Sequence, residues 1–226
     1  MWGDLSYKGL GTSQLWCIVP VSNRSRFAML DELLRRVVSH TPDTLETDRS
    51  FPEAAVLVPV TRSDEPELIL TLRASGLSTH GGEVAFPGGR RDPEDPDLIF
   101  TALREAEEEI GLPPGLVEII GPLSPLISKH GIKVTPYVGV IPDFVEYRPN
   151  DGEIAAVFSV PLEFFRQDTR EHTHRIDYEG RSWYVPSYRY GEYKIWGLTA
   201  IMIVELVNVM YGTQISLHHP PERSTT

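Results

Sequence analysis

The order of candidate elements predicts an α/β fold in which a mixed β-sheet is held between helices. Three observations support this prediction. Strand-like runs occur both before and after residues 95–111, which show helical spacing. A short amphipathic helical pattern precedes the first run, and a longer apolar one follows the last. With 226 residues, the chain is long enough for one domain with a substantial core plus extensions.

The first predicted helix covers about residues 24–40. Its apolar side chains recur at helical spacing and face away from a set of charged residues, so we expect them to pack on the domain. These side chains are Phe27, Leu30, Leu34, Val37 and Val38. We divide the chain into an N-terminal extension with this helix (1–50), a main domain (51–212) and a C-terminal tail (213–226).

Runs rich in β-branched and apolar residues predict the strands, and the first two are separated by the turn-like sequence SDEPE. The expected strands are 54–60, 68–73, 117–120, 133–141, 153–160, 173–178 and 182–185. A helical turn is expected at 161–165 and a closing helix at 196–210, with Glu205 facing solvent.

The central helix has clear start and stop signals. Asp95 suits the N-cap and Pro96 the first helical position, while Gly111 is a typical C-terminal stop. At about 100° per residue, four apolar side chains form one stripe. They are Ile99, Leu103, Ala106 and Ile110.

A second face of this helix carries Glu105, Glu108 and Glu109. Like charges at this spacing destabilise a helix by a few tenths of a kcal/mol each, and a divalent cation reverses that effect. Carboxylate oxygens select a hard ion, Mg²⁺ or Mn²⁺. The alternative is a solvated acidic face, which is the usual fate of a glutamate run. Arg104 lies one turn before Glu108 and can orient it.

Composition limits the classes of partner. The net charge of −11 argues against broad binding to nucleic acids or anionic membranes. The single cysteine, Cys17, excludes an internal disulfide framework and suits a reducing compartment. No apolar stretch reaches the ~18 residues of a membrane span. We therefore expect a cytoplasmic protein, and its oligomeric state, monomer or homodimer, stays open.

The residues around this helix resemble the signature box of the Nudix hydrolases. The similarity covers the proline-glycine-glycine turn at 87–89 and the run REAEEEIGL at 104–112. Two positions depart from the usual box: Asp95 stands where a glutamate is common, and eight residues rather than seven separate it from Arg104. The resemblance implies an α/β/α sandwich and hydrolysis of a diphosphate joined to another moiety, with Mg²⁺ or Mn²⁺ on the helix.

Further residues are similar to the coenzyme A pyrophosphatase subgroup of this family. They include the strand end LILTLR at 68–73, the His-x-Gly step at 80–82 and the sequence FPGG at 86–89. More matches lie at 135–139, at Asn150 with Glu153, and at 195–200. Glu83 departs from the glutamine that is usual at its position. The subgroup implies hydrolysis of coenzyme A or an acyl derivative to 3′,5′-ADP and 4′-phosphopantetheine.

The resemblance assigns roles that agree with the reading of the helix. The implied metal ligands are Glu105, Glu108 and Glu109. Arg104 would orient Glu108, and the carboxylate that takes the proton of the attacking water is Glu108, Glu105 or Glu153. An arginine and backbone N–H groups can point at phosphate oxygens from the adjoining loop. The implied substrate-binding residues are Arg73, His80, Gly82, Gly88 and Gly89.

Other functions remain open at this point. One is a Nudix diphosphatase acting on ADP-ribose, a nucleotide sugar or a nucleoside triphosphate. Another is a non-catalytic module that senses a nucleotide, although such a protein has no need of the complete Arg-Glu-x-x-Glu-Glu set. The aromatic side chains of Phe86 and Trp196 could stack on adenine, but core packing is the commoner role of such residues.

Overall fold

The structure is a computed structural model that describes residues 28–45, 49–76, 81–178 and 181–219. Its helices are α1 (Ala28–Ser39), α2 (Leu98–Ile110), the 3₁₀ turn η1 (Pro114–Leu116), α3 (Leu162–Arg166) and α4 (Gly197–Tyr211). Its strands are β1 (Glu53–Arg62), β2 (Glu67–Arg73), β3 (Val84–Ala85), β4 (Gly88–Arg90), β5 (Glu118–Pro122), β6 (Leu126–Ile127), β7 (Lys133–Pro142), β8 (Ile154–Pro161), β9 (His172–Tyr178), β10 (Arg181–Tyr190) and β11 (Tyr193–Ile195).

The main sheet is mixed and centres on β1. Strand β1 runs parallel to β7 over its whole length, from Glu53 beside Lys133 to Arg62 beside Pro142. On its other edge β1 pairs with the antiparallel strands β4 and β2, and β2 also pairs with β3 and β8. The outer strands β5 and β6 pair with β7. The short strands β3 and β4 therefore bring the glycine turn to the middle of the sheet.

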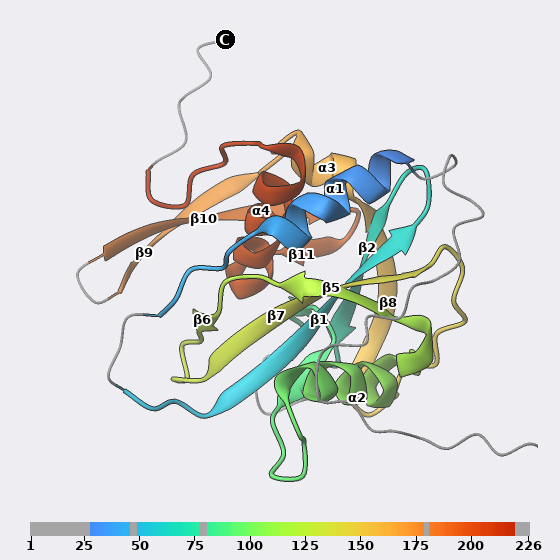
Figure 1. The fold of residues 1–226 in the computed structure, drawn as a ribbon. Helices are drawn as coiled ribbons and strands as arrows, with labels where there is room; N and C mark the ends of the chain where they lie inside the picture. Colours follow the sequence, from blue (N-terminus) through green and yellow to red (C-terminus); the bar gives the residue numbers. More distant parts are fainter. Residues whose placement is uncertain (1–27, 46–48, 77–80, 179–180, 220–226) are drawn as a thin grey trace, which may run out of the picture.

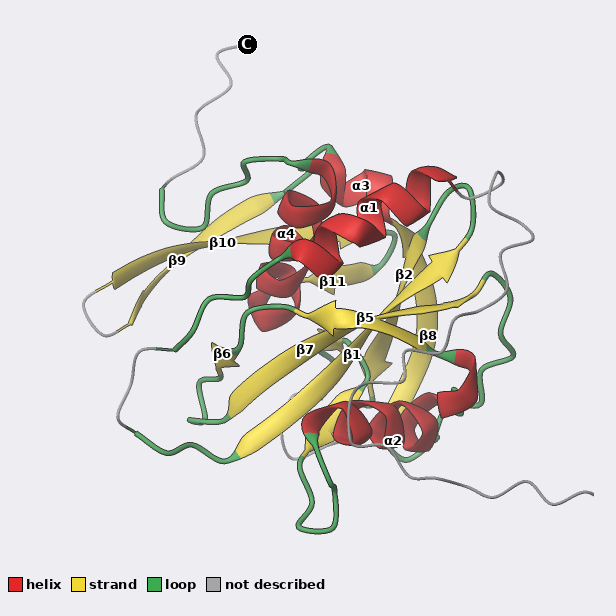
Figure 2. Cartoon of the chain, in the orientation of Figure 1, coloured by secondary structure: helices red, strands yellow, loops and turns green. Residues whose placement is uncertain are grey.

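Helices cover both faces of this sheet (Figures 1 and 2). Because successive side chains of a strand point to opposite faces, β1 contributes to two cores. Ala55 and Leu57 pack with α2 on one face, whereas Val58 and Val60 pack with α1 and α4 on the other. The predicted α/β/α arrangement with a mixed sheet is confirmed.

Some elements differ from the sequence prediction in extent. Strands β3, β4, β6 and β11 have only two or three residues each, too few to show a period, and the prediction did not include them. The two expected edge strands form a hairpin, β9 and β10, which pairs with β11 in a separate three-stranded sheet. Strand β10 extends to Tyr190, well beyond the expected end at residue 185.

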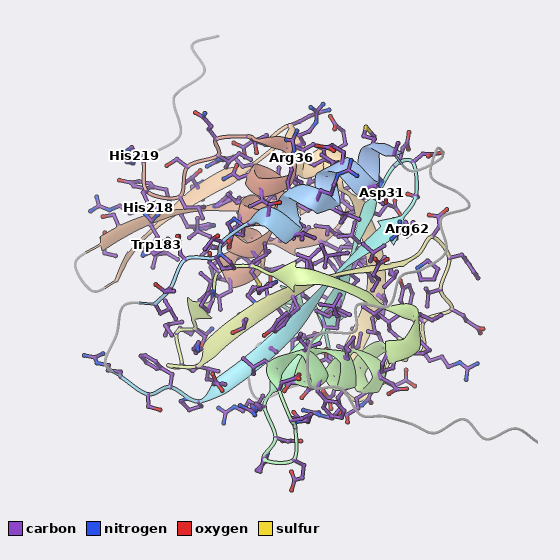
Figure 3. The ribbon with its side chains drawn as sticks, viewed as in Figure 1. Asp31, Arg36, Arg62, Trp183, His218 and His219 are labelled. Carbon is purple, nitrogen blue, oxygen red and sulfur yellow. The ribbon has the colours of Figure 1, made fainter. Side chains whose placement is uncertain are left out.

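Helix α1 is held against the main domain. Its side chains Leu30, Leu33, Leu34 and Val37 are buried in the same core as α4. At its outer edge, Arg62 of β1 binds Asp31 at 3.1 Å, and the two side chains lie next to each other in Figure 3. The division at residue 50 remains a prediction, and the expected extension before residue 24 lies outside the described residues.

The prediction that Glu205 of α4 faces solvent is wrong. Its Oε1 accepts hydrogen bonds from the backbone N–H of Ser124 at 2.9 Å and from the Ser124 hydroxyl at 2.6 Å, and it lies 2.9 Å from His40 Nε2. The side chain is only 17% exposed. Glu205 therefore joins α4 to the end of α1 and to the loop after β5.

The segment after α4 folds back on the domain as far as it is described. The side chain of Asn208 binds the backbone of Ile215, and the N–H of Tyr184 donates to the carbonyl of Leu217 at 2.7 Å. Beside this contact, the ring centroids of Trp183 and His218 lie 4.7 Å apart, and both side chains are labelled in Figure 3. Within the described ranges, no helix has both the length and the apolar character needed to span a membrane.

Candidate active site

The glutamate-bearing helix α2 starts later than the sequence predicts and ends where predicted. Its N-cap is Asp97, whose carboxylate accepts a hydrogen bond of 2.8 Å from the N–H of Phe100. The prediction of Asp95 as N-cap is therefore wrong by two residues. At the other end, Gly111 adopts φ 67°, a left-handed conformation that glycine adopts readily.

The buried face of α2 is also rotated relative to the predicted stripe. Ala106 and Ile110 are buried as expected, and Ala102 joins them. Ile99 and Leu103 are only partly buried. This rotation turns the last of the three glutamates toward the sheet.

Glu109 is the most enclosed acidic side chain of the helix, at 3% exposure. Its Oε1 accepts a hydrogen bond from Arg73 Nη1 at 2.9 Å, and its Oε2 accepts one from the N–H of Gly88 at 3.0 Å. Burial raises the pKa of Glu109 to about 7, although the Gly88 N–H and the Arg73 guanidinium both act to lower it. The helix, the glycine turn and the end of β2 therefore meet at one carboxylate.

The two glycines of the turn are required by close packing. A Cβ at Gly88 would lie 2.4 Å from the carbonyl oxygen of Ala55 on β1, and φ there is 158°. A Cβ at Gly89 would lie 2.4 Å from the carboxyl carbon of Glu105. The second contact places Glu105 directly over β4. Because the Gly88 N–H is bonded to Glu109, this amide is not free to bind a phosphate in the present arrangement.

Arg104 joins the remaining acidic groups. Its Nη1 lies 3.0 Å from a carboxylate oxygen of both Glu105 and Glu108, so it reaches Glu108 as the spacing predicts. On its other side, its Nε and Nη2 donate to the two oxygens of Asp95 at 3.1 and 3.0 Å. Burial raises the pKa of Glu105, against the lowering effect of Arg104.

Asp95 holds the guanidinium of Arg104 on the side away from Glu105 and Glu108. Its side chain is 2% exposed and also accepts hydrogen bonds from the hydroxyl of Thr101 and the N–H of Asp92. Hydrogen bonding from Arg104 is the largest cause that lowers the pKa of Asp95 to about 2. Asp95 therefore positions the arginine that contacts the helix glutamates. The sequence analysis gave Asp95 as the N-cap and as a departure from the usual box, and it did not predict this contact with Arg104.

The end of β2 brings together Arg73, the glycine-rich loop and Glu153. The Arg73 carbonyl accepts a hydrogen bond from the N–H of Gly82 at 3.0 Å, and the N–H of Ala74 donates to the Glu153 carbonyl at 2.8 Å. Glu153 is partly buried, and its carboxylate has no hydrogen-bond or ion-pair partner among the described residues. His80, which the sequence places in this loop, lies outside the described residues.

Comparison with known proteins shows the family of the chain. Residues 51–178 match the family described as the NUDIX domain. The chain belongs to the NUDIX family. A protein of Shigella sonnei named "Uncharacterized Nudix hydrolase NudL" is 43% identical over 181 residues, covering 80% of this chain and 94% of that protein.

Other NUDIX proteins show the same relationship. A protein of the same name from Yersinia pestis is 44% identical over 170 residues, covering 75% of this chain and 84% of that protein. The solved MutT/nudix family protein from Enterococcus faecalis has a TM-score of 0.50 and 14% identity, covering 84% of this chain and 71% of that chain, which shows the fold alone. These names identify the family and give no substrate, so the coenzyme A subgroup stays a prediction.

The three glutamates of this NUDIX site offer the type of ligand atom that a hard divalent ion prefers. Glu105, Glu108 and Glu109 offer carboxylate oxygens only, which is what Mg²⁺ and Mn²⁺ prefer. Two of the three have raised pKa values because they are buried, a cost that a bound cation offsets. In the described part of the chain, no three acidic, histidine or cysteine side chains are gathered around one point, and Arg73 and Arg104 pair with the three glutamates. Glu105, Glu108 and Glu109 are the residues that would hold the ion.

A cavity on the same side of the sheet as α2 contains none of the predicted site residues. It has a volume of about 800 Å³ and is lined in part by Phe51, Glu53, Leu98, Lys133 and Tyr137. It opens at the start of the parallel strands β1 and β7. The volume is in the range of small-molecule sites, and two of its charged groups pair with each other, as Lys133 Nζ lies 3.3 Å from Glu53 Oε1.

Proposed function

We propose that this Nudix hydrolase cleaves the diphosphate of coenzyme A or an acyl-coenzyme A. The products would be 3′,5′-ADP and the corresponding 4′-phosphopantetheine, and the reaction would require Mg²⁺ or Mn²⁺. The observation that carries the proposal is the contact of Glu109 with Arg73 and Gly88. It joins the helix of the Nudix box to the strand end and glycine turn that resemble the coenzyme A subgroup.

The chemistry starts from a highly charged substrate. A divalent ion on Glu105, Glu108 and Glu109 would neutralise diphosphate oxygens and lower the pKa of a bound water. Water attacks one phosphorus, the bridging P–O bond breaks, and the leaving phosphate departs as a monoester. Positioning and charge neutralisation provide most of the catalysis in such reactions.

Other residues of the site would bind the phosphate, position the glutamates and accept the proton of the water. Arg73 lies at the end of β2 with its guanidinium at the buried carboxylate, so it can turn toward a phosphate oxygen when the ion binds. Arg104, fixed by Asp95, keeps Glu105 and Glu108 in place. Glu153 suits the acceptor of the water's proton because its carboxylate is unpaired among the described residues. Glu108 and Glu105 are the other candidates, and general-base help contributes about 10²–10⁴-fold.

The test is incubation of the purified chain with coenzyme A and Mg²⁺ or Mn²⁺, with the products identified by mass. We expect 4′-phosphopantetheine and 3′,5′-ADP, and no turnover in EDTA. ADP-ribose, a nucleotide sugar and a nucleoside triphosphate are measured in parallel. Intact coenzyme A beside a hydrolysed member of this panel would assign the other diphosphatase function.

Two site variants test the helix itself. Glu108→Gln and Glu109→Gln should each lower kcat by several hundred-fold or more, within the range of removing a charge-stabilising or acid–base group. A matched control is Glu107→Gln, an exposed glutamate on the same helix outside the site. Wild-type turnover in both site variants would remove α2 from the mechanism. Tight nucleotide binding without any turnover would instead favour a sensing module.

A further inference from the structure

The short segment just before β8 is hydrogen-bonded to the C-terminal end of α2. We call residues 148–153 the strap. At its first end, the N–H of Arg148 donates to the carbonyl of Ile110, and the N–H of Asn150 donates to the carbonyl of Glu109, both at 2.8 Å. These bonds satisfy two carbonyls that a helix C-terminus leaves without intrahelical partners. The strap is thus attached to the residue that carries the buried carboxylate.

The second half of the strap turns at Asn150 and is held by hydrogen bonds to this residue. Its carbonyl accepts hydrogen bonds from the N–H of Glu153 at 2.9 Å and of Ile154 at 2.8 Å. Its side-chain Oδ1 accepts a third, at 3.1 Å, from the N–H of Gly152. The carbonyl of Glu153 in turn accepts the N–H of Ala74, next to Arg73. The backbone of Glu153 is therefore held on both sides.

The strap also packs closely against the end of the helix. A Cβ at Gly111 would lie 2.9 Å from the Cβ of Arg148 and 3.2 Å from its backbone nitrogen and oxygen. Glycine at position 111 therefore leaves the room that the strap needs to pass this close to the helix end. Backbone hydrogen bonds thus link Glu109 to Asn150 and Asn150 to Glu153.

We propose that Asn150 is a positioning residue that fixes the carboxylate of Glu153 relative to Glu109 and Arg73. The inference rests on the proposed hydrolysis, in which Glu153 is a candidate proton acceptor. No described residue bonds the Glu153 carboxylate, so its placement depends on the backbone that Asn150 organises. Misplacement of a reacting group by about 1 Å can cost about 10²-fold in rate.

The kinetic test compares Asn150→Ala with Asn150→Asp, on whichever diphosphate of the panel is hydrolysed. Aspartate keeps an oxygen that accepts the Gly152 N–H, and alanine does not. We expect alanine to lower kcat by about 10- to 100-fold with KM nearly unchanged, and aspartate to restore most of the loss. Asp151→Asn, an exposed change in the same strap, should leave turnover as in the wild type.

A double-mutant cycle separates positioning from general loosening of the fold. If Asn150 acts through Glu153, Asn150→Ala adds less than about twofold to the loss already caused by Glu153→Gln, because interacting residues are not additive. Losses that multiply would overturn the inference. So would an aspartate variant as impaired as the alanine one.

Amide hydrogen exchange gives a readout that needs no activity. In Asn150→Ala, the amides of Ala74, Glu153 and Ile154 should exchange about tenfold faster or more, while that of Leu57, bonded to Pro87, stays protected. Unchanged exchange at Ala74 would overturn the inference even if activity fell. If no diphosphate is hydrolysed, the proposed function fails, and this exchange pattern still decides whether Asn150 holds the strap.

Discussion

Replacing Asp95 by asparagine removes the charge that fixes Arg104 while keeping the size of the side chain. The wild-type carboxylate accepts two hydrogen bonds from Arg104, one from Thr101 and one from the N–H of Asp92. Asparagine offers a single acceptor oxygen and places an NH₂ group against the guanidinium. The variant therefore leaves part of a buried arginine contact unsatisfied.

The magnitude follows from this geometry. Hydrogen bonds to charged groups contribute about 1.5–3 kcal/mol, and breaking a fully buried ion pair costs about 3–5 kcal/mol. Arg104 is 19% exposed and keeps its contacts with Glu105 and Glu108, so the lower part of this range applies. We expect a loss of about 2–3 kcal/mol in the free energy of unfolding. For a chain of this length, that lowers Tm by about 4–12 °C.

The effect should depend on pH with a defined sign. The folded pKa of Asp95 is about 2, below its ordinary value of 3.8, so the stabilisation is complete above about pH 4. It is lost as pH falls from 4 toward 2, where the folded protein also takes up the proton. The difference between wild type and Asp95→Asn, measured by urea unfolding, should therefore be full at pH 7 and 5 and shrink near pH 3.

Asp92→Asn is the matched control for this prediction. The Asp92 carboxylate faces the same arginine at 3.7 Å but is 60% exposed, so its loss should change stability by less than about 0.5 kcal/mol. Equal effects of the two variants, or a constant cost of Asp95→Asn from pH 7 to pH 3, would refute the account of Asp95 as a buried support.

Three further changes probe the site and the fold. Gly89→Ala should leave Tm within about 3 °C but lower kcat by about 10²-fold, because its Cβ meets the carboxyl end of a side chain, Glu105, and no backbone, and calorimetry with a kinetic assay checks both. Gly88→Ala should instead destabilise the fold by more than about 2 kcal/mol, because its Cβ meets the backbone of β1; a cost below 1 kcal/mol would contradict the tight packing. Glu205→Ala should cost about 2–3 kcal/mol in urea unfolding with unchanged KM, because Ser124 and His40 lose their shared acceptor; wild-type stability would show that this contact contributes nothing.

The start of α2 shows why part of the site was beyond sequence reasoning. Asp95 and Asp97 are equally good N-caps by residue type, and Pro96 lies between them. The choice depends on Arg104, which binds Asp95 from the second turn of the helix and leaves Asp97 to cap it. Helical spacing placed Arg104 near Glu108, but it carried no information about a residue before the helix.

Glu205 shows the same limit in another helix. A charged residue in an apolar helix is usually exposed, and the sequence predicts that here. The partners of its carboxylate, Ser124 and His40, come from a loop and a helix end far away in the chain. Only the packing of α1 and α4 on one face of the sheet brings them together.

The sequence by itself determined the fold class, the glutamate ridge of α2 and its end at Gly111, because these follow from periodicity and from local backbone preference. Tertiary structure decided which carboxylate is buried, which aspartate supports Arg104 and how Glu153 is held. Those outcomes depend on contacts between distant segments, above all the pairing of β4 with β1 and of β3 with β2, which sets the glycine turn next to Glu109. Such pairings are settled by the shape of the whole sheet, and no local pattern encodes them.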